Sequence, residues 1–280
     1  MSASPPLEAP VSAAAYRARS ATELIDATFQ LLRKNFPQFY TLAALFYVPI
    51  AVIPRLFTPT SLQSGDPAAV TSVGASFFVG FIVFVFLFVI LSAIFQTAMY
   101  YACSDAYLGK PVDIADVVKR GIRHWGTMAG GFFLQGLAIG VATLFFIIPG
   151  IIVFTTLFAV PCVIAFENTA VLEAFSRSGQ LSKGLKGHIF LTMLLAGAIY
   201  FVGAIIVYFI ANLIAGGLGR TTVLSQTVIT LGTSLIFPLL PLAITLLYYD
   251  ARIRKEGFDI ELMAQQVGGP AAEATKPQPA

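Results

Sequence analysis

The feature that most constrains this chain is a set of long hydrophobic stretches without charged residues. There are six of them, and none contains Asp, Glu, Lys or Arg. They cover residues 39–53, 76–101, 127–148, 151–166, 189–214 and 223–249. A helix needs about 20 apolar residues to cross the hydrocarbon core of a bilayer. The pattern therefore predicts an all-α, polytopic membrane bundle of about six transmembrane helices.

The basic residues fall on one side of these stretches when the spans are threaded in order. Of the 17 Lys and Arg residues, all but Arg55 and Arg220 lie on the side of the N-terminus. Cytoplasmic loops carry such an excess of Lys and Arg. We therefore expect a multi-pass protein of the inner (cytoplasmic) membrane with both termini in the cytoplasm. A chain with 57% hydrophobic and 11% charged residues is too apolar for a soluble domain.

Three segments are expected along the chain. Residues 1–20 and 264–280 predict disordered cytoplasmic tails, and residues 21–263 predict the six-span membrane domain. The loops expected on the external side of the membrane are residues 54–74, 149–150 and 216–222. Residues 127–166 are either two full spans or a re-entrant hairpin, because the fourth stretch is short and the loop charges do not distinguish the two.

Each pair of spans is preceded by a short amphipathic segment on the cytoplasmic side. The three segments are residues 22–36, 112–125 and 169–186. Ser20 followed by Glu23 is a capping-box start for the first, and Asp113 and Asn168 are candidate N-caps for the others. We interpret the chain as three copies of one unit, an in-plane helix followed by two spans. The alternative is that loops between spans tend to be amphipathic in general.

The basic residues of these segments and of the C-terminal run suit the headgroups of an anionic leaflet. Those predicted to lie at this interface are Arg33, Lys34, Arg120, Arg123, Arg177, Lys183, Arg252, Arg254 and Lys255. They are equally explained if they serve only to orient insertion. A collar of ion pairs is also expected, formed with the acids Asp116, Glu173 and Asp250. Its hypothesised pairs join Arg252 or Arg254 to Glu173 or Asp116.

Groups that support catalysis or cofactor binding are sparse. His124 and His188 are isolated, and Cys103 and Cys162 have no metal-ligand spacing. We therefore expect no enzymatic activity, no cofactor, no metal site and no nucleic-acid partner. A lipid-headgroup hydrolase is the remaining enzymatic alternative, and it needs acidic residues that converge at the cytoplasmic rim. The candidate acids are Asp105, Glu167 and Asp250.

Glycine and proline residues mark close approaches and kinks within the spans. Two GxxxG spacings, Gly126 with Gly130 and Gly136 with Gly140, allow helices to approach closely. Packing within one bundle is the favoured interpretation, and homo-oligomer formation is the alternative. Kinks are expected at Pro161, Pro238 and Pro241.

Several motifs resemble a known family. They are Pro149-Gly150, Glu167, residues 173–178 (EAFSRS), residues 181–184 (LSKG) and residues 248–259 (YYDARIRKEGFD), together with residues 24–36. From Thr22 to Leu262 the chain resembles the membrane domain of bacterial glycerophosphoryl diester phosphodiesterases and its stand-alone relatives. The resemblance implies the membrane fold. It does not imply hydrolase activity, because no His-Arg-Gly motif or catalytic barrel follows the sixth span.

These observations lead to two hypotheses about function. The first is a non-enzymatic membrane module at the cytoplasmic leaflet that scaffolds lipid or a partner protein. The lipid expected is anionic. The alternative is a transporter or flippase for a lipid-like or apolar substrate. A polar or amphipathic cavity between the spans favours the alternative, whereas a densely packed bundle favours the module.

Overall fold

The computed structural model describes residues 17–57, 75–216, 223–258 and 260, and its regular elements there are all helices. The helices are α1 (Ala21–Lys34), α2 (Phe36–Phe57), α5 (Ala75–Tyr107), α6 (Ile114–Phe145), α7 (Ile147–Thr156), α8 (Val160–Glu167), α9 (Val171–Ser182), α10 (Lys186–Gly216), α11 (Val223–Ser234) and α12 (Leu239–Glu256). The predicted all-α membrane bundle is confirmed, because five segments of the described chain are long and apolar enough to cross a membrane. Helix α2 adds a further apolar helix of 22 residues.

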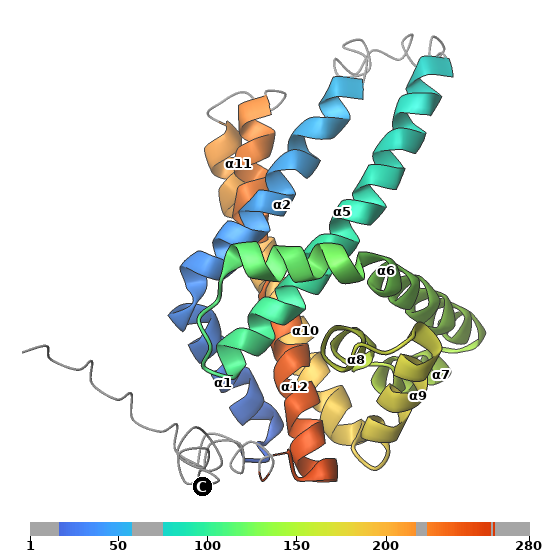
Figure 1. The fold of residues 1–280 in the computed structure, drawn as a ribbon. Helices are drawn as coiled ribbons and strands as arrows, with labels where there is room; N and C mark the ends of the chain where they lie inside the picture. Colours follow the sequence, from blue (N-terminus) through green and yellow to red (C-terminus); the bar gives the residue numbers. More distant parts are fainter. Residues whose placement is uncertain (1–16, 58–74, 217–222, 259, 261–280) are drawn as a thin grey trace, which may run out of the picture.

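The helices fall into two groups (Figure 1). Helices α2, α5, α10 and α11 extend upward in the view, and α1 and α12 lie at their lower end. Helices α6 to α9 form a second group beside the lower part of the first. The core lies where α5, α8 and α12 meet, and its largest fully buried side chains include Met99, Ile164 and Tyr248. The second group is therefore anchored to the first through α6, which packs on α5, and through α8, whose residues 160–165 are all buried.

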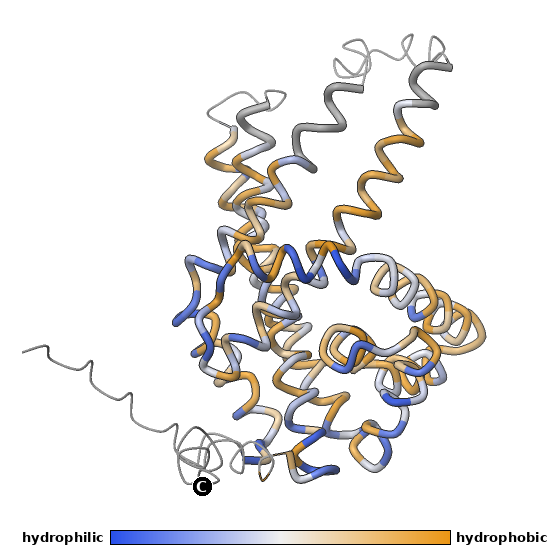
Figure 2. Tube along the Cα trace, viewed as in Figure 1, coloured by the Kyte–Doolittle hydropathy of each residue, from blue (hydrophilic) through white to orange (hydrophobic). Residues whose placement is uncertain are grey.

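Apolar side chains cover the outer surfaces of the long helices. Many residues in 81–89 of α5 and 201–214 of α10 are large, hydrophobic and exposed. In water such continuous apolar surface is unfavourable, whereas hydrocarbon solvates it without cost. Charged residues gather instead in the lower half of the view, from the start of α6 downward (Figure 2). We call this region the charged end: α1, the start of α6, the α8–α9 junction, the start of α10 and the end of α12.

The predicted in-plane helices form in two of the three copies. Helix α1 is separate from α2, and its capping box between Ser20 and Glu23 is present as predicted. Helix α9 is also separate, but the Glu173 carboxylate caps it by accepting from the Ala170 N–H, and the predicted cap Asn168 has a left-handed backbone. The repeat is therefore incomplete, because the second copy has no separate in-plane helix.

That second copy requires a correction. The predicted in-plane segment 112–125 and the span from residue 127 belong to one continuous helix, α6. Gly126 alone lies at the expected boundary, and one glycine costs a helix only about 1 kcal/mol. Asp113 caps this helix as predicted, through the Ala115 N–H.

The turn that follows α6 also differs from the prediction. The chain reverses at Phe146, the single extended residue between α6 and α7, and not at Pro149-Gly150. Pro149 lies in the first turn of α7, where its missing N–H has no intrahelical partner to lose. A Cβ on Gly150 would come within 2.2 Å of Thr143 Oγ1, so this glycine permits α7 to contact α6.

Close helix packing uses other glycines than those of the two GxxxG spacings. On α6, a Cβ at Gly121 would meet the Ile94 carbonyl oxygen at 2.6 Å, and one at Gly131 would meet Ile164 at 2.4 Å. Gly126, Gly136 and Gly140 have no such neighbours within 4 Å among the described residues, and Gly130 has only Val171 at 3.5 Å. The interpretation of the GxxxG spacings as internal packing is therefore wrong for these positions.

Two of the three prolines lie at helix breaks as expected, whereas Pro241 lies in the first turn of the continuous helix α12. Pro161 follows the break between α7 and α8, and Pro238 is the residue before α12. The predicted tails and outer loops lie largely outside the described residues, which omit 1–16, 58–74, 217–222, 259 and 261–280. Residues 17–20 are a correction to the predicted tail, because they are described and Arg19 bonds to Asp250.

Candidate functional site at the charged end

Three clusters of ion pairs hold the charged end together. Each is centred on one acid that sequence analysis named, and each joins different helices. A buried carboxylate loses its hydration and is tolerated only when charged or polar donors replace the water. The partners of each acid therefore decide whether it is part of the framework or open to a substrate.

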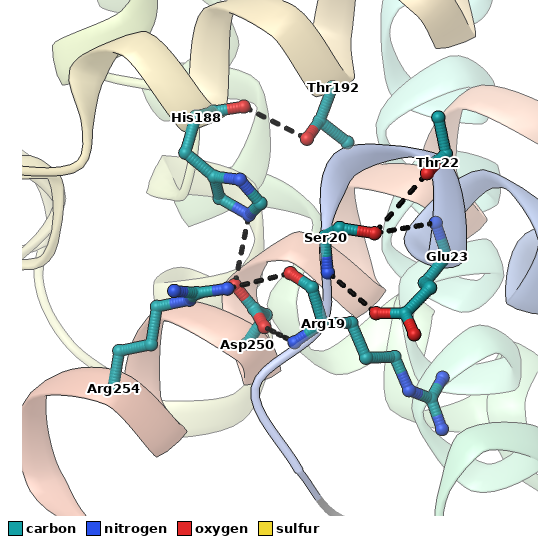
Figure 3. A network of polar contacts seen from close by, with 8 residues as sticks. All are labelled: Arg19, Ser20, Thr22, Glu23, His188, Thr192, Asp250 and Arg254. Carbon is teal, nitrogen blue, oxygen red and sulfur yellow. Dashed lines mark hydrogen bonds and ion pairs between the residues drawn. The ribbon is translucent and has the colours of Figure 1, made fainter.

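The first cluster surrounds Asp250 on α12, which is 2% exposed (Figure 3). Its Oδ1 accepts a hydrogen bond of 2.7 Å from the backbone N–H of Arg19. Its Oδ2 accepts one of 2.7 Å from Arg254 Nε and lies 3.1 Å from His188 Nε2 at the start of α10. Arg254 also donates to the Arg19 carbonyl oxygen at 2.6 Å. The cluster thus fastens the segment before α1 to α10 and α12.

The second cluster surrounds Glu167 at the end of α8. Arg177 Nε of α9 lies 2.9 and 3.2 Å from its two carboxylate oxygens, and the Tyr248 hydroxyl donates to Oε1 at 2.9 Å. Arg177 also pairs with Glu256 at 2.5 Å, and Glu256 accepts from Arg252 at 3.0 Å. Burial disfavours the charged form of Arg177, but the bonds and charges of Glu167 and Glu256 outweigh it and raise its pKa.

The third cluster joins α5 to the start of α6. Arg120 of α6 forms an ion pair with Asp105 of α5 and a second, of 2.8 Å, with Asp116 one turn earlier on its own helix. Its guanidinium also lies 4.7 Å from the centre of the Tyr101 ring, within range of a cation–π interaction. Asp105 is mostly buried between the helices, and Arg120 neutralises the negative charge of its carboxylate.

The nine predicted interface cations divide into two sets. Four of them, Arg120, Arg177, Arg252 and Arg254, form the ion pairs just described. The others are exposed, and none forms an ion pair within the described part of the chain. They are Arg33, Lys34, Arg123, Lys183 and Lys255. Only this second set is open to an external partner.

The predicted collar exists, but its hypothesised pairs are wrong. Asp116 pairs with Arg120, and Arg254 pairs with Asp250 on its own helix. Glu173 caps α9 and Arg252 pairs with Glu256. The reason is geometric: residues four apart on α6 and α12 are neighbours on one helix face, and this local pairing satisfies the charges.

The acids proposed for the hydrolase alternative are not brought together. Asp105, Glu167 and Asp250 each belong to a different cluster and each has a basic partner. Within the described residues no group of three metal-ligating side chains is found. This arrangement suits structural ion pairs, since catalysis needs titratable groups that converge on one reacting atom.

Sequence reasoning missed the side chains that form hydrogen bonds to the backbone at the break between α7 and α8. Residues 157–159 are buried, and Gln135 Nε2 of α6 donates to the Leu157 carbonyl oxygen at 2.9 Å. The Ser178 hydroxyl of α9 donates to the Thr156 carbonyl oxygen at 2.8 Å and accepts from the Ala159 N–H at 3.2 Å. The position of Gln135 in a hydrophobic stretch was the one signal that pointed to this contact.

An apolar groove lies between α2, α5 and α6. Its volume is about 200 Å³, and its lining is entirely hydrophobic. Leu42 and Phe46 come from α2, Ile94 from α5, and Val118 and Ile122 from α6. A groove of this kind can hold an alkyl chain, but it offers no polar group to select a headgroup.

Comparison of the chain with known protein families, with curated proteins and with solved structures finds no match. The resemblance to the membrane domain of glycerophosphoryl diester phosphodiesterases therefore stays a prediction.

Proposed function

We propose that this protein is a non-enzymatic membrane module that binds anionic lipid headgroups at the cytoplasmic leaflet. In this proposal the charged end faces the cytoplasm of a bacterial cell and both termini lie there. The resemblance to the phosphodiesterase membrane domain supports the same assignment, because it implies the membrane fold. A protein partner at the same surface is the second form of the proposal.

The observation that supports this proposal best is the division of the basic residues. Four arginines are neutralised by acids within the collar, so they stabilise the fold and are not needed to bind a ligand. Arg33, Lys34, Arg123, Lys183 and Lys255 remain exposed at the charged end. Basic residues at a membrane surface each contribute about 1 kcal/mol of attraction to an anionic leaflet.

The transporter or flippase alternative draws on the groove between α2, α5 and α6. The groove is apolar and small, and its described lining contains no charged residue that could guide a headgroup across the membrane. A flippase must provide polar groups along its path, because moving a charged headgroup through hydrocarbon is costly. We therefore rank the module above the transporter, and the hydrolase below both.

Quantitative mass spectrometry of lipids that co-purify with the protein tests the proposal. The wild type, extracted in mild detergent, is expected to carry anionic phospholipid enriched above its share of the bulk membrane. The double variant Lys183→Gln, Lys255→Gln removes two exposed cations of the charged end and is expected to lose much of this enrichment. The matched control, Arg55→Gln with Arg220→Gln, removes two cations predicted to lie on the other side.

Three results bear on the proposal in different ways. Loss of enrichment in the first variant but not in the control supports headgroup binding at the charged end. Absence of enrichment in the wild type, together with a stoichiometric co-purified protein, supports the protein-partner form. Absence of both, or an equal loss in the control, contradicts the proposal.

A further inference from the structure

The tip of the hairpin formed by α6 and α7 is apolar on all sides. Its five consecutive residues are between 71% and 86% exposed. They are Leu144, Phe145, Phe146, Ile147 and Ile148. The connections that follow α2 and α10 are different in sequence, since they contain Asp66 and Arg220 respectively. A tip without a polar residue is suited to hydrocarbon and not to the water beyond the membrane.

The base of the same hairpin belongs to the charged end. Helix α6 begins beside Asp113 and carries Arg120 and Arg123, and the returning limb ends at Glu167. Figure 2 shows the charged residues near this base and hydrophobic residues along the rest of the hairpin. Both ends of the hairpin therefore lie on one side of the bilayer.

Hydrogen bonds to α9 limit how deep the tip can reach. The Ser178 hydroxyl bonds to the Thr156 carbonyl oxygen at the end of α7. Its neighbour Arg177 pairs with Glu256 at the charged end, and the proposed orientation puts this end, and α9 with it, at the level of the headgroups. Helix α7 has ten residues, and at about 1.5 Å per residue it spans about 15 Å. The tip thus lies at most about 15 Å from α9, half of a hydrocarbon core of about 30 Å.

On the other limb the limit comes from the contact of Gln135, since α6 as a whole is long enough to cross a membrane. Gln135 of α6 bonds to the Leu157 carbonyl oxygen, so it lies at the level of the break that Ser178 contacts. From Gln135 to Phe145 the helix rises about 15 Å. Figure 1 shows α6 running across the view and α7 beside the lower part of the bundle, whereas α2 and α5 continue past them.

The backbone of the tip is only partly hydrogen-bonded. Only Phe146 leaves helical geometry, and its N–H still donates to the Ala142 carbonyl oxygen. The Gly150 N–H donates to the Phe146 carbonyl oxygen, and Pro149 has no N–H to satisfy. In the first turn of α7 the Ile147 and Ile148 N–H groups thus remain without an intrahelical partner, and in lipid each unpaired group is costly.

We propose that the α6–α7 hairpin is re-entrant and that residues 144–148 are covered by acyl chains near the middle of the bilayer. The hairpin enters from the charged end and returns to it without reaching the opposite surface. This inference deepens the proposed function by naming acyl chains of one leaflet as the ligand of the tip. It depends on that function only for the assignment of the charged end to the cytoplasm.

Single cysteines at three positions test the topology with a membrane-impermeant maleimide, applied to intact cells and to inverted vesicles. Lys183→Cys reports the charged end, and Gly65→Cys reports the loop predicted to be external. Phe146→Cys is expected to stay at the labelling level of the wild type in both preparations and to react after denaturation. Cys103 and Cys162 are fully buried, which keeps the wild-type background low. Ile148→Cys provides a second tip position if the first variant does not fold.

A nitroxide spin label on the same tip cysteine, in vesicles, identifies what covers it. Collisions with oxygen but not with an aqueous nickel complex are expected, because only oxygen partitions into hydrocarbon. Labelling of Phe146→Cys from the side opposite to Lys183→Cys would show that the hairpin crosses the membrane and overturn the proposal. A spin label shielded from both reagents would show that protein covers the tip, which also overturns it. Neither result depends on lipid enrichment, so the proposed function stands or fails separately.

Discussion

The backbone N–H of Arg19 donates a 2.7 Å hydrogen bond to the carboxylate of Asp250, although the two residues are 231 positions apart. The same carboxylate receives the Arg254 guanidinium, which in turn bonds to the Arg19 carbonyl oxygen. Both backbone polar groups of Arg19, its N–H and its carbonyl, are therefore hydrogen-bonded to side chains in the last turns of α12. This relationship closes the charged end, because it joins the first and last described parts of the membrane bundle.

Replacing Asp250 with Asn tests how far this closure stabilises the fold. The variant keeps the shape of the side chain but removes the charge that Arg254 pairs with. A hydrogen bond to a charged group contributes about 1.5–3 kcal/mol, and we expect a loss of that size, seen as a lower thermal unfolding midpoint in detergent. Asp26→Asn is the control, because Asp26 is exposed and forms no ion pair within the described residues. Equal midpoints for the two variants would show that the Asp250 cluster is dispensable.

Replacing Ser178 with Ala tests the polar contacts at the break between α7 and α8. The change leaves the buried Ala159 N–H and the Thr156 carbonyl oxygen without this partner. An unsatisfied buried polar group costs about 1–3 kcal/mol, so the unfolding midpoint is expected to fall clearly. Ser176→Ala, two residues away on the same helix and exposed, is expected to leave the midpoint within error of the wild type. A similar fall in both variants would mean that the hydrogen bonds of Ser178 do not account for the loss of stability.

Replacing Gly121 with Ala tests the contact between α5 and α6. The added Cβ would meet the Ile94 carbonyl oxygen at 2.6 Å, and backbone cannot move aside as a flexible side chain can. Overpacking of this kind costs about 1–3 kcal/mol. Gly136→Ala, on the same helix and without neighbours within 4 Å in the described residues, is expected to be neutral or to stabilise by up to about 1 kcal/mol through helix propensity. Thermal unfolding of the two variants side by side distinguishes them, and the reverse order would contradict the structure of this interface.

Local features of the fold could be predicted from the sequence, and long-range contacts could not. Ser20 and Glu23 are three residues apart, so their capping box follows from the sequence alone. The glycines at GxxxG spacing are also visible, but whether they face a neighbour depends on the direction of α6. That direction places Gly121 and Gly131, and not Gly136 and Gly140, against other helices.

The candidate site shows the same limit. Basic residues at the charged end were predictable, because insertion and interfacial position select for them. Their division into paired and exposed sets was not, since Arg177 meets Glu256 only after α9 and α12 have packed. The expected pairing of Arg254 with a distant acid failed for a similar reason: Asp250, four residues earlier, lies within reach on the same helix.

The two kinds of cation can be separated by replacing one of each. Arg177 and Lys183 are close in sequence, but Arg177 bonds to Glu167 and Glu256, whereas Lys183 is exposed. Arg177→Gln leaves two partly buried carboxylates without this counter-ion, and we expect a loss of about 1–3 kcal/mol, less than for a fully buried pair because water reaches the cluster. Lys183→Gln is expected to change stability by no more than about 0.5 kcal/mol.

The contrast between these two variants should reverse when lipid is measured. Lys183→Gln should reduce the anionic lipid that co-purifies, because the exposed ammonium group of Lys183 is free to attract anionic headgroups. Arg177→Gln should leave the lipid content of the folded fraction unchanged, because its charge is already neutralised by acids of the collar. If Arg177→Gln removed bound lipid while the unfolding midpoint stayed constant, Arg177 would belong to the binding surface, and the division of the cations into structural and lipid-facing sets would be wrong.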